Sequence, residues 1–312
     1  MRTKVLRRML LRSSCTAGLI AAFAVSAAAQ QAKPAPPTKS VEEQTIRTAD
    51  GWSLPITYYR SSGGKNTPVV ILLHGKEGNR LVWKGLGEKL QGAGYAAVAV
   101  DLRKHGDSQA PPNAGPRSER LVASDYQKMV LLDLEAVKNF LINEHEGERL
   151  NIRKTAIVAA DDSAPVAVTW AVFDWDKKPW SDAPTLAART PKGQDVRAIA
   201  LLSPSEGAGT LNLGRTVPVL KSDALGVSFY IAVGSEDRDD RGASEKAYER
   251  LTTGGGAMKE RMFLDEFDRV KTRGTDLLGV RNLSVEGRIL KFLDERLKPL
   301  DDKWQTRKSR LQ

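Results

Sequence analysis

Three apolar runs of the sequence each end at residues that could take part in acid–base or nucleophilic chemistry. An imidazole can accept and return a proton near neutral pH, and a carboxylate can attack an electrophilic carbon directly. The ends of these runs are therefore the first places to search for a site. The runs and the residues that follow them are Pro68–Leu73 with His74, Tyr95–Val100 with Asp101, and Thr155–Ala159 with Ala160, Asp161, Asp162 and Ser163.

Histidine, the usual proton carrier of hydrolytic sites, is scarce in this sequence. The three histidines are His74, His105 and His145, and none of them follows Asp161. We expect His74 and His105 to hydrogen-bond their own loops, and His145 to be exposed at a polar helix end. The sequence contains no H-x-x-x-H or similar cluster, so it predicts no metal site and no cofactor.

Alternating strands and helices must position these residues. Thr45–Tyr59 alternates in polarity around a turn at Ala49–Gly51, which predicts an N-terminal β-hairpin. Strands that alternate with helices predict an α/β fold, with a mostly parallel central sheet and helices on both faces. Further strands are expected at Val196–Leu202 and Val227–Val233, and helices over Trp83–Leu90, from an N-cap at Ser124 to Leu141, near Ser244–Leu251 and near Ser284–Leu297.

The N-terminus predicts export. Met1–Arg12 holds five Lys or Arg and no acid, Ala17–Val25 is apolar, and Ala27–Ala29 completes the pattern of a cleaved signal peptide. The apolar run is too short to span a bilayer core of about 30 Å. We predict a signal peptide over 1–29, an extended linker over 30–44, one domain over 45–298 and a polar tail over 299–312. The mature protein would be periplasmic or extracellular, exported by either the Sec or the twin-arginine route, with no stable membrane anchor.

Composition excludes several classes of partner. The formal charge of +10 falls to about +5 once the five cations of the signal peptide are removed. The remaining basic residues are interspersed with acids, which is typical of a solvated surface and not of a nucleic-acid interface. The single Cys15 is also removed, so the mature chain would form no disulfide. Phe173–Gln194, rich in Trp, Pro, Lys and Asp, is expected to be a surface excursion and not a second domain.

Two loop motifs resemble those of the α/β-hydrolase superfamily. Leu72–Gly75 is similar to the family's apolar strand ending in His-Gly, and Asp101–Ser108 to its Asp-x-Arg-Gly-x-Gly-x-Ser, with Lys104 in place of a Gly. The resemblance covers roughly residues 45–298. It implies the α/β-hydrolase fold without a sizeable lid domain. It also implies loop-structural roles for His74, Gly75, Asp101, Arg103 and His105.

The resemblance places Asp161 where the family has its nucleophile. In that family the next strand leads into a tight turn, G-x-S-x-G, that exposes the nucleophile between two small residues. Here Ala159 and Ser163 are the small residues on either side of Asp161. Ser163 is the alternative nucleophile, although it would lengthen the strand and put Asp161 at a crowded position. The oxyanion-hole positions of the family correspond to the N–H groups of Lys76 and Asp162.

The other two triad positions are also implied by the resemblance. Asp237 matches the position of the family's acid, and Arg273 stands where relatives often have the histidine of a His-Gly pair. A guanidinium does not accept and return protons near neutral pH. Asp161 lies at the start of a helix, where a carboxylate is favoured. We therefore predict an Asp161–Arg273–Asp237 ion cluster in place of a Ser–His–Asp triad.

Three functions follow from this interpretation. The first is an exported, catalytically inactive protein that acts as a binding or structural module for an unknown small molecule or protein. The second is an active serine-type hydrolase of small esters, amides or similar substrates, with a non-standard site. The third is an enzyme that uses Asp161 covalently, as haloalkane dehalogenases and epoxide hydrolases do, although such enzymes still need a histidine. Convergence of the two carboxylates on Arg273 favours the first, and an exposed Ser163 beside a proton acceptor favours the second.

Overall fold

The computed structural model describes residues 40–112, 120–254 and 257–311. The predicted signal peptide lies outside the described residues. Among the described residues, no helix combines the length and the apolar character needed to cross a membrane.

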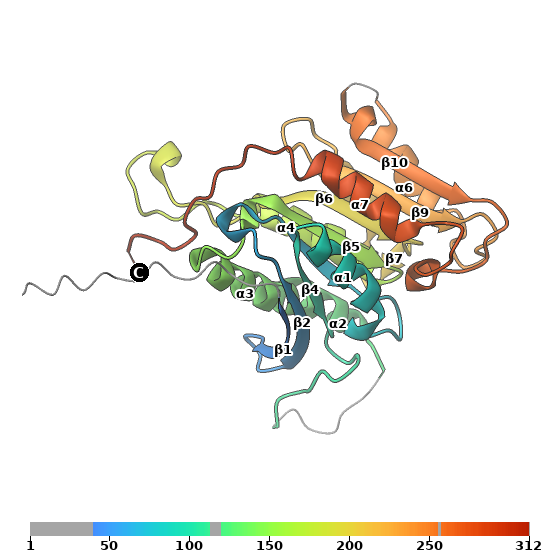
Figure 1. Ribbon diagram of the computed structural model, residues 1–312, viewed down its shortest axis with the longest axis horizontal. Helices are drawn as coiled ribbons and strands as arrows, with labels where there is room; N and C mark the ends of the chain where they lie inside the picture. Colours follow the sequence, from blue (N-terminus) through green and yellow to red (C-terminus); the bar gives the residue numbers. More distant parts are fainter. Residues whose placement is uncertain (1–39, 113–119, 255–256, 312) are drawn as a thin grey trace, which may run out of the picture. The chain divides into compact units, whose positions relative to one another are not determined.

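An eight-stranded sheet forms the centre of the domain, in the order β1-β2-β4-β3-β5-β6-β9-β10 (Figure 1). The hairpin strand β2 pairs antiparallel with β1 and with β4, and every other pairing in the sheet is parallel. The predicted α/β-hydrolase fold is thus confirmed, with its N-terminal hairpin. The strands are β1 (Ser40–Arg47), β2 (Ser53–Arg60), β3 (Val69–Leu73), β4 (Ala96–Val100), β5 (Thr155–Ala160), β6 (Val196–Leu202), β9 (Ser228–Gly234) and β10 (Met262–Phe267), and a separate small hairpin joins β7 (Gly207–Ala208) to β8 (Leu211–Asn212).

Helices cover both faces of this sheet because successive strand residues point to opposite sides. In β3, Val69 and Ile71 belong to one core cluster with residues of α3, α4 and α5, whereas Val70 and Leu72 belong to a second cluster with residues of α1 and α7. Figure 1 shows α1 and α7 on one side of the sheet. The helices are α1 (Lys84–Gly92), α2 (Ala123–Lys128), α3 (Leu134–Glu146), α4 (Ser163–Asp176), α5 (Leu213–Leu220), α6 (Ala243–Thr252) and α7 (Val285–Arg296).

The predicted helix from Ser124 to Leu141 differs in two respects. Its N-cap is Val122 and not Ser124, because the Asp125 carboxylate accepts a hydrogen bond from the Val122 N–H at 2.9 Å. A π-helical turn over Met129–Asp133 separates α2 from α3. This turn ends at Asp133, whose carboxylate binds the Arg103 side chain and backbone N–H.

The expectation that His145 is exposed is wrong. His145 is fully buried, because the C-terminal segment crosses the end of α3 and covers it. The Trp304 ring stacks on the imidazole at 4.8 Å, and the Trp304 indole N–H donates to the His145 carbonyl. Residues 299–311, predicted as a polar tail, are therefore packed on the domain. At the other end, β1 begins at Ser40, within the stretch predicted as linker.

Candidate functional site

Asp161 occupies the turn between β5 and α4. Its φ is +48°, in the left-handed region that only a few residue types adopt readily. Glycines make room for its carboxylate: a Cβ on Gly75 would lie 2.2 Å from Asp161 Oδ2, and one on Gly274 would lie 2.4 Å from it. Asp161 therefore lies in a tight strand-to-helix turn, where the elbow was predicted, and the close approach explains why Gly75 and Gly274 carry no side chain.

Ser163, the alternative nucleophile, lies differently. It is the first residue of α4, it is buried, and its hydroxyl donates to the His74 carbonyl at 2.5 Å. The hydroxyl thus ties the elbow to the loop that follows β3. A serine hydrolase would need the Ser163 hydroxyl to be exposed beside a proton acceptor. The structure does not have this arrangement.

Arg273 joins the two carboxylates predicted to surround it. Its Nε lies 2.5 Å from Asp161 Oδ1, and its Nη1 lies 2.9 Å from Asp237 Oδ2. The second oxygen of Asp237 accepts from the backbone N–H groups of Asp239 and Asp240. The Arg273 side chain is 21% exposed, that of Asp161 is 16% exposed and that of Asp237 is 3% exposed. The cluster is therefore largely withdrawn from water, with one edge open.

Three further residues extend this cluster, and the sequence did not predict that they would. Arg273 Nη2 donates to Ser205 Oγ at 3.3 Å, and the Ser205 hydroxyl donates to Asp162 Oδ1 at 2.8 Å. The other oxygen of Asp162 accepts from the Tyr126 hydroxyl at 3.1 Å. Ser205 follows β6, the neighbour of β5, and residues that follow parallel strands gather at one edge of the sheet. That rule could have found Ser205, whereas nothing local marks Tyr126.

The carboxylates make the site acidic. Burial raises the pKa of Asp161 to about 6; Arg273 acts in the opposite direction, and the nearby Asp162 and Asp237 add to the increase. Burial beside Asp162 also raises the pKa of Tyr126. One guanidinium thus lies among three carboxylates, so the cluster itself carries net negative charge.

The loop residues predicted to be structural are bonded within the domain. His74 accepts from the Leu102 N–H through Nε2 and contacts the Gly75 carbonyl through Nδ1, and burial lowers its pKa to about 3. His105 packs on it with ring centroids 4.7 Å apart. Asp101 binds Arg80 at 2.6 Å, and the buried Arg103 binds Asp133 at 2.6 Å and Asp50 at 3.0 Å.

A pocket of about 420 Å³ lies beside the elbow. It contains both residues of the predicted oxyanion-hole positions, Lys76 and Asp162, together with His105, the pKa of whose imidazole is lowered by burial. Lys104 also lines the pocket, and its ammonium group binds Asp125 at 2.8 Å. Among the residues that the structure describes, no group of His, Cys, Asp and Glu is arranged to hold a metal ion.

Comparison with known proteins supports the same fold. The model of a family described as alpha/beta hydrolase fold matches residues 68–161, from β3 to the elbow. Epoxide hydrolase 3 of Xenopus tropicalis is 33% identical over 73 residues, which are 23% of this chain and 20% of that protein. The match therefore spans about a fifth of that relative's length.

Solved structures are similar over most of the chain. An esterase of Pyrococcus furiosus superposes with a TM-score of 0.57 at 16% identity, covering 83% of this chain and 92% of the esterase. A dienelactone hydrolase of Anabaena variabilis gives a TM-score of 0.56 at 14% identity, covering 84% of this chain and 100% of that one. At these identities the likeness shows the fold alone.

Proposed function

This chain is a protein of the α/β-hydrolase fold, and we propose that it is a catalytically inactive member that acts as a binding or structural module. A single observation carries the proposal. Arg273 lies between Asp161 at the elbow and Asp237 at the acid position, and bonds both at 2.5 and 2.9 Å. The Arg273 guanidinium thus bridges two carboxylates at the place where a serine hydrolase has a histidine that carries protons.

The chemistry of these groups supports inactivity. A serine-type mechanism needs a nucleophile whose proton a neutral imidazole accepts and later returns. Arg273 has no acceptor atom and stays protonated near neutral pH. Asp161 could attack as a carboxylate, but the ester so formed would need a base to activate water. An oxyanion that formed beside Asp161 would also face negative charge, which opposes the usual stabilisation.

Restoring the missing groups tests this proposal. The wild-type protein should show no turnover of short-chain nitrophenyl esters and no labelling by a fluorophosphonate. The double variant Asp161→Ser/Arg273→His should gain labelling at the introduced serine and esterase activity on the order of a hundredfold above background, because we expect the N–H groups of Lys76 and Asp162 to serve as its oxyanion hole. Ser163→Ala is the matched control and should leave the wild-type result unchanged. Turnover by the wild type that Ser163→Ala abolishes would overturn the proposal.

One observation favours a second function, an active hydrolase of small esters or amides with a non-standard site. The His105 imidazole lines the same pocket as Asp162, and burial lowers its pKa, so a group able to accept a proton lies near the elbow. If the wild-type protein hydrolyses esters, His105→Gln should abolish that activity, whereas Arg273→Lys should preserve it. Inactive wild-type protein with an intact fold would exclude this second function for the esters tested.

We also propose that the chain is exported with residues 1–29 removed as a signal peptide. The basic start, the short apolar run and the Ala27–Ala29 end support this proposal. N-terminal sequencing of the protein recovered from the periplasm or medium of an expressing bacterium should begin near Gln30. An uncleaved start at Met1 in the cytoplasmic fraction would contradict it.

A further inference from the structure

A basic pocket lies at the end of β5 and α4 opposite to the elbow. Arg153 precedes β5, Arg197 stands near the start of β6, and Lys177 directly follows α4. The 14 residues of α4 separate this pocket from Asp161 by about 20 Å, at 1.5 Å per residue. The pocket is therefore independent of the candidate catalytic site.

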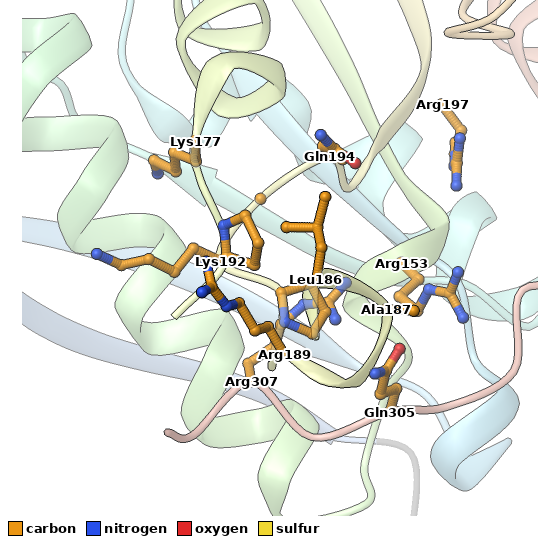
Figure 2. Close-up of a pocket in the computed structure, with 13 residues that line it drawn as sticks. Arg153, Lys177, Leu186, Ala187, Arg189, Lys192, Gln194, Arg197, Gln305 and Arg307 are labelled. Atoms are coloured by element: carbon orange, nitrogen blue, oxygen red, sulfur yellow. The ribbon is translucent and has the colours of Figure 1, made fainter. Parts of the chain in front are cut away.

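Six cationic side chains line this pocket of about 330 Å³, and no acidic residue does (Figure 2). They come from segments distant in the sequence: the turn before β5, strand β6, the excursion after α4, and the C-terminal segment. The cavity is called the basic pocket, and its six cations are Arg153, Lys177, Arg189, Lys192, Arg197 and Arg307.

The acids around the basic pocket neutralise only part of its charge. Asp302 lies 3.1 Å from both Arg153 and Arg197, and Glu135 binds Lys177 at 2.6 Å. The two remaining cations on the excursion have no carboxylate partner among the described residues. Arg189 donates through Nε to the Ala183 carbonyl, and the Lys192 ammonium group lies 3.9 Å from the Trp180 ring centroid.

Arg307 supplies a second, independent observation. The residue is 4% exposed, and its Nη2 binds Asp195, but its Nε and Nη1 have no hydrogen-bond acceptor among the described residues. A buried donor without an acceptor costs about 1–3 kcal/mol, so such groups need a structural or functional explanation. An oxyanion held in the pocket that Arg307 lines would stabilise the guanidinium charge through space, without bonding these two covered nitrogens.

The pocket is built before any ligand arrives. Trp180 joins the excursion to the C-terminal segment, since its indole N–H donates to the Arg307 carbonyl at 3.3 Å. Asp182 accepts from the backbone N–H groups of Thr190 at 2.9 Å and Arg310 at 3.1 Å. Preorganised donors lose little conformational entropy when they bind. The excursion and the C-terminal segment are thus held together, and both contribute side chains to the basic pocket.

We propose that the basic pocket binds a small molecule that carries at least two negative charges on phosphoryl or carboxylate groups. Guanidinium groups match the paired oxygens of both anions. The volume suits a molecule of modest size and not a polymer, and Leu186, Pro179 and Pro191 give it partly apolar walls. Binding here depends neither on the elbow nor on loss of catalysis.

Titration calorimetry of the full mature protein at low salt tests this proposal. Pyrophosphate and citrate serve as the two probes, one for each anion class. The variant Arg189→Gln/Lys192→Gln removes two cations that hold no carboxylate, so it should keep the wild-type melting temperature while weakening binding of the better probe about tenfold or more. The control Lys84→Gln/Lys128→Gln removes two exposed cations elsewhere, with the same change in net charge, and should stay within about twofold of wild type.

The outcomes separate the sources of binding. Preference for pyrophosphate identifies the ligand as a phosphate compound, and preference for citrate identifies it as a carboxylate. Equal loss in both double variants would show a general effect of net charge and overturn the proposal. Absence of binding to both probes would overturn it as well. So would binding to phosphatidylglycerol vesicles that pyrophosphate does not displace, since that would identify a membrane surface. Arg273→Ala should leave pyrophosphate or citrate binding unchanged, which keeps this test separate from that of the proposed function.

Discussion

Both ends of α4 hold a cation between two carboxylates, but the two clusters differ in burial. Before the helix, Arg273 joins Asp161 and Asp237, and its side chain is 21% exposed. At the end of the helix, Lys138 joins two other carboxylates and its side chain is only 3% exposed. The same pairing of charges therefore occurs once at the elbow and once inside the core.

The buried cluster consists of Lys138, Asp174 and Asp195. Lys138 binds Asp174, and it lies 3.1 Å from Asp195. The Asp195 backbone N–H donates to Asp174, and Arg307 also binds Asp195. Charge attraction from the two carboxylates raises the pKa of Lys138 despite its burial. This cluster links α3, α4, the residue before β6 and the C-terminal segment.

The comparison shows one arrangement of charges at two degrees of exposure to solvent. A fully buried ion cluster costs desolvation and is retained only where all of its partners are in place. The elbow cluster also holds two aspartates around a cation, but its Arg273 side chain is partly exposed to solvent. The three predictions that follow measure how far the two clusters differ.

The largest effect is expected for Lys138→Met. Without the ammonium group, Asp174 and Asp195 are left as neighbouring buried carboxylates, so the free energy of unfolding should fall by about 3–5 kcal/mol. Urea unfolding followed by circular dichroism measures this change. Lys291→Met, which removes an exposed partner 4.0 Å from Glu295, is the control and should cost less than about 1 kcal/mol. A loss below 1 kcal/mol for Lys138→Met would show that the buried cluster is not structural.

Arg273→Ala should destabilise the protein by a smaller amount. The elbow cluster is partly hydrated, so we expect the free energy of unfolding to fall by about 2–4 kcal/mol, somewhat less than for a fully buried pair. Lys271→Ala is the matched control on the same loop, because Lys271 is 77% exposed and lies 3.5 Å from Glu236. If both variants unfold at the same urea concentration as wild type, the Asp161–Arg273–Asp237 cluster does not stabilise the fold.

The smallest effect concerns the pH dependence of Asp161. Its pKa in the folded protein is about 6, above the value of about 3.9 for an unfolded chain. Between these values the folded state binds more protons, so the contribution of Asp161 to stability falls as the pH rises and is fully lost above about pH 6. After allowance for solvent screening, the loss should be about 1–2 kcal/mol.

Asp161→Asn removes this ionisation. The unfolding free energy of wild type minus that of Asp161→Asn should therefore decrease from pH 4 to pH 7, while ionisations common to both proteins cancel. A difference that increases with pH would mean that Arg273 outweighs burial and lowers the pKa of Asp161.

Much of the fold was predictable because strand and helix patterns are local. The apolar run that forms β3 and the turn between β1 and β2 can each be recognised from a few consecutive residues. Neither β10 nor α5 was predicted, because β10 is only partly buried and lacks a continuous apolar run, and α5 contains Pro218. His145 was misjudged because the segment that buries it lies some 160 residues away along the chain.

The sequence by itself determined that no histidine follows Asp161, and that glycines accompany His74 and Arg273. These facts depend on residue identity and chain order alone. Only the tertiary structure decided that Arg273 reaches both Asp161 and Asp237, that Ser205 and Tyr126 bind Asp162, and that six cations from distant segments share one pocket. Contacts of this kind depend on how the loops at each edge of the sheet fold over it. Charged side chains that are distant in the sequence interact only where the fold brings them within a few ångströms of one another.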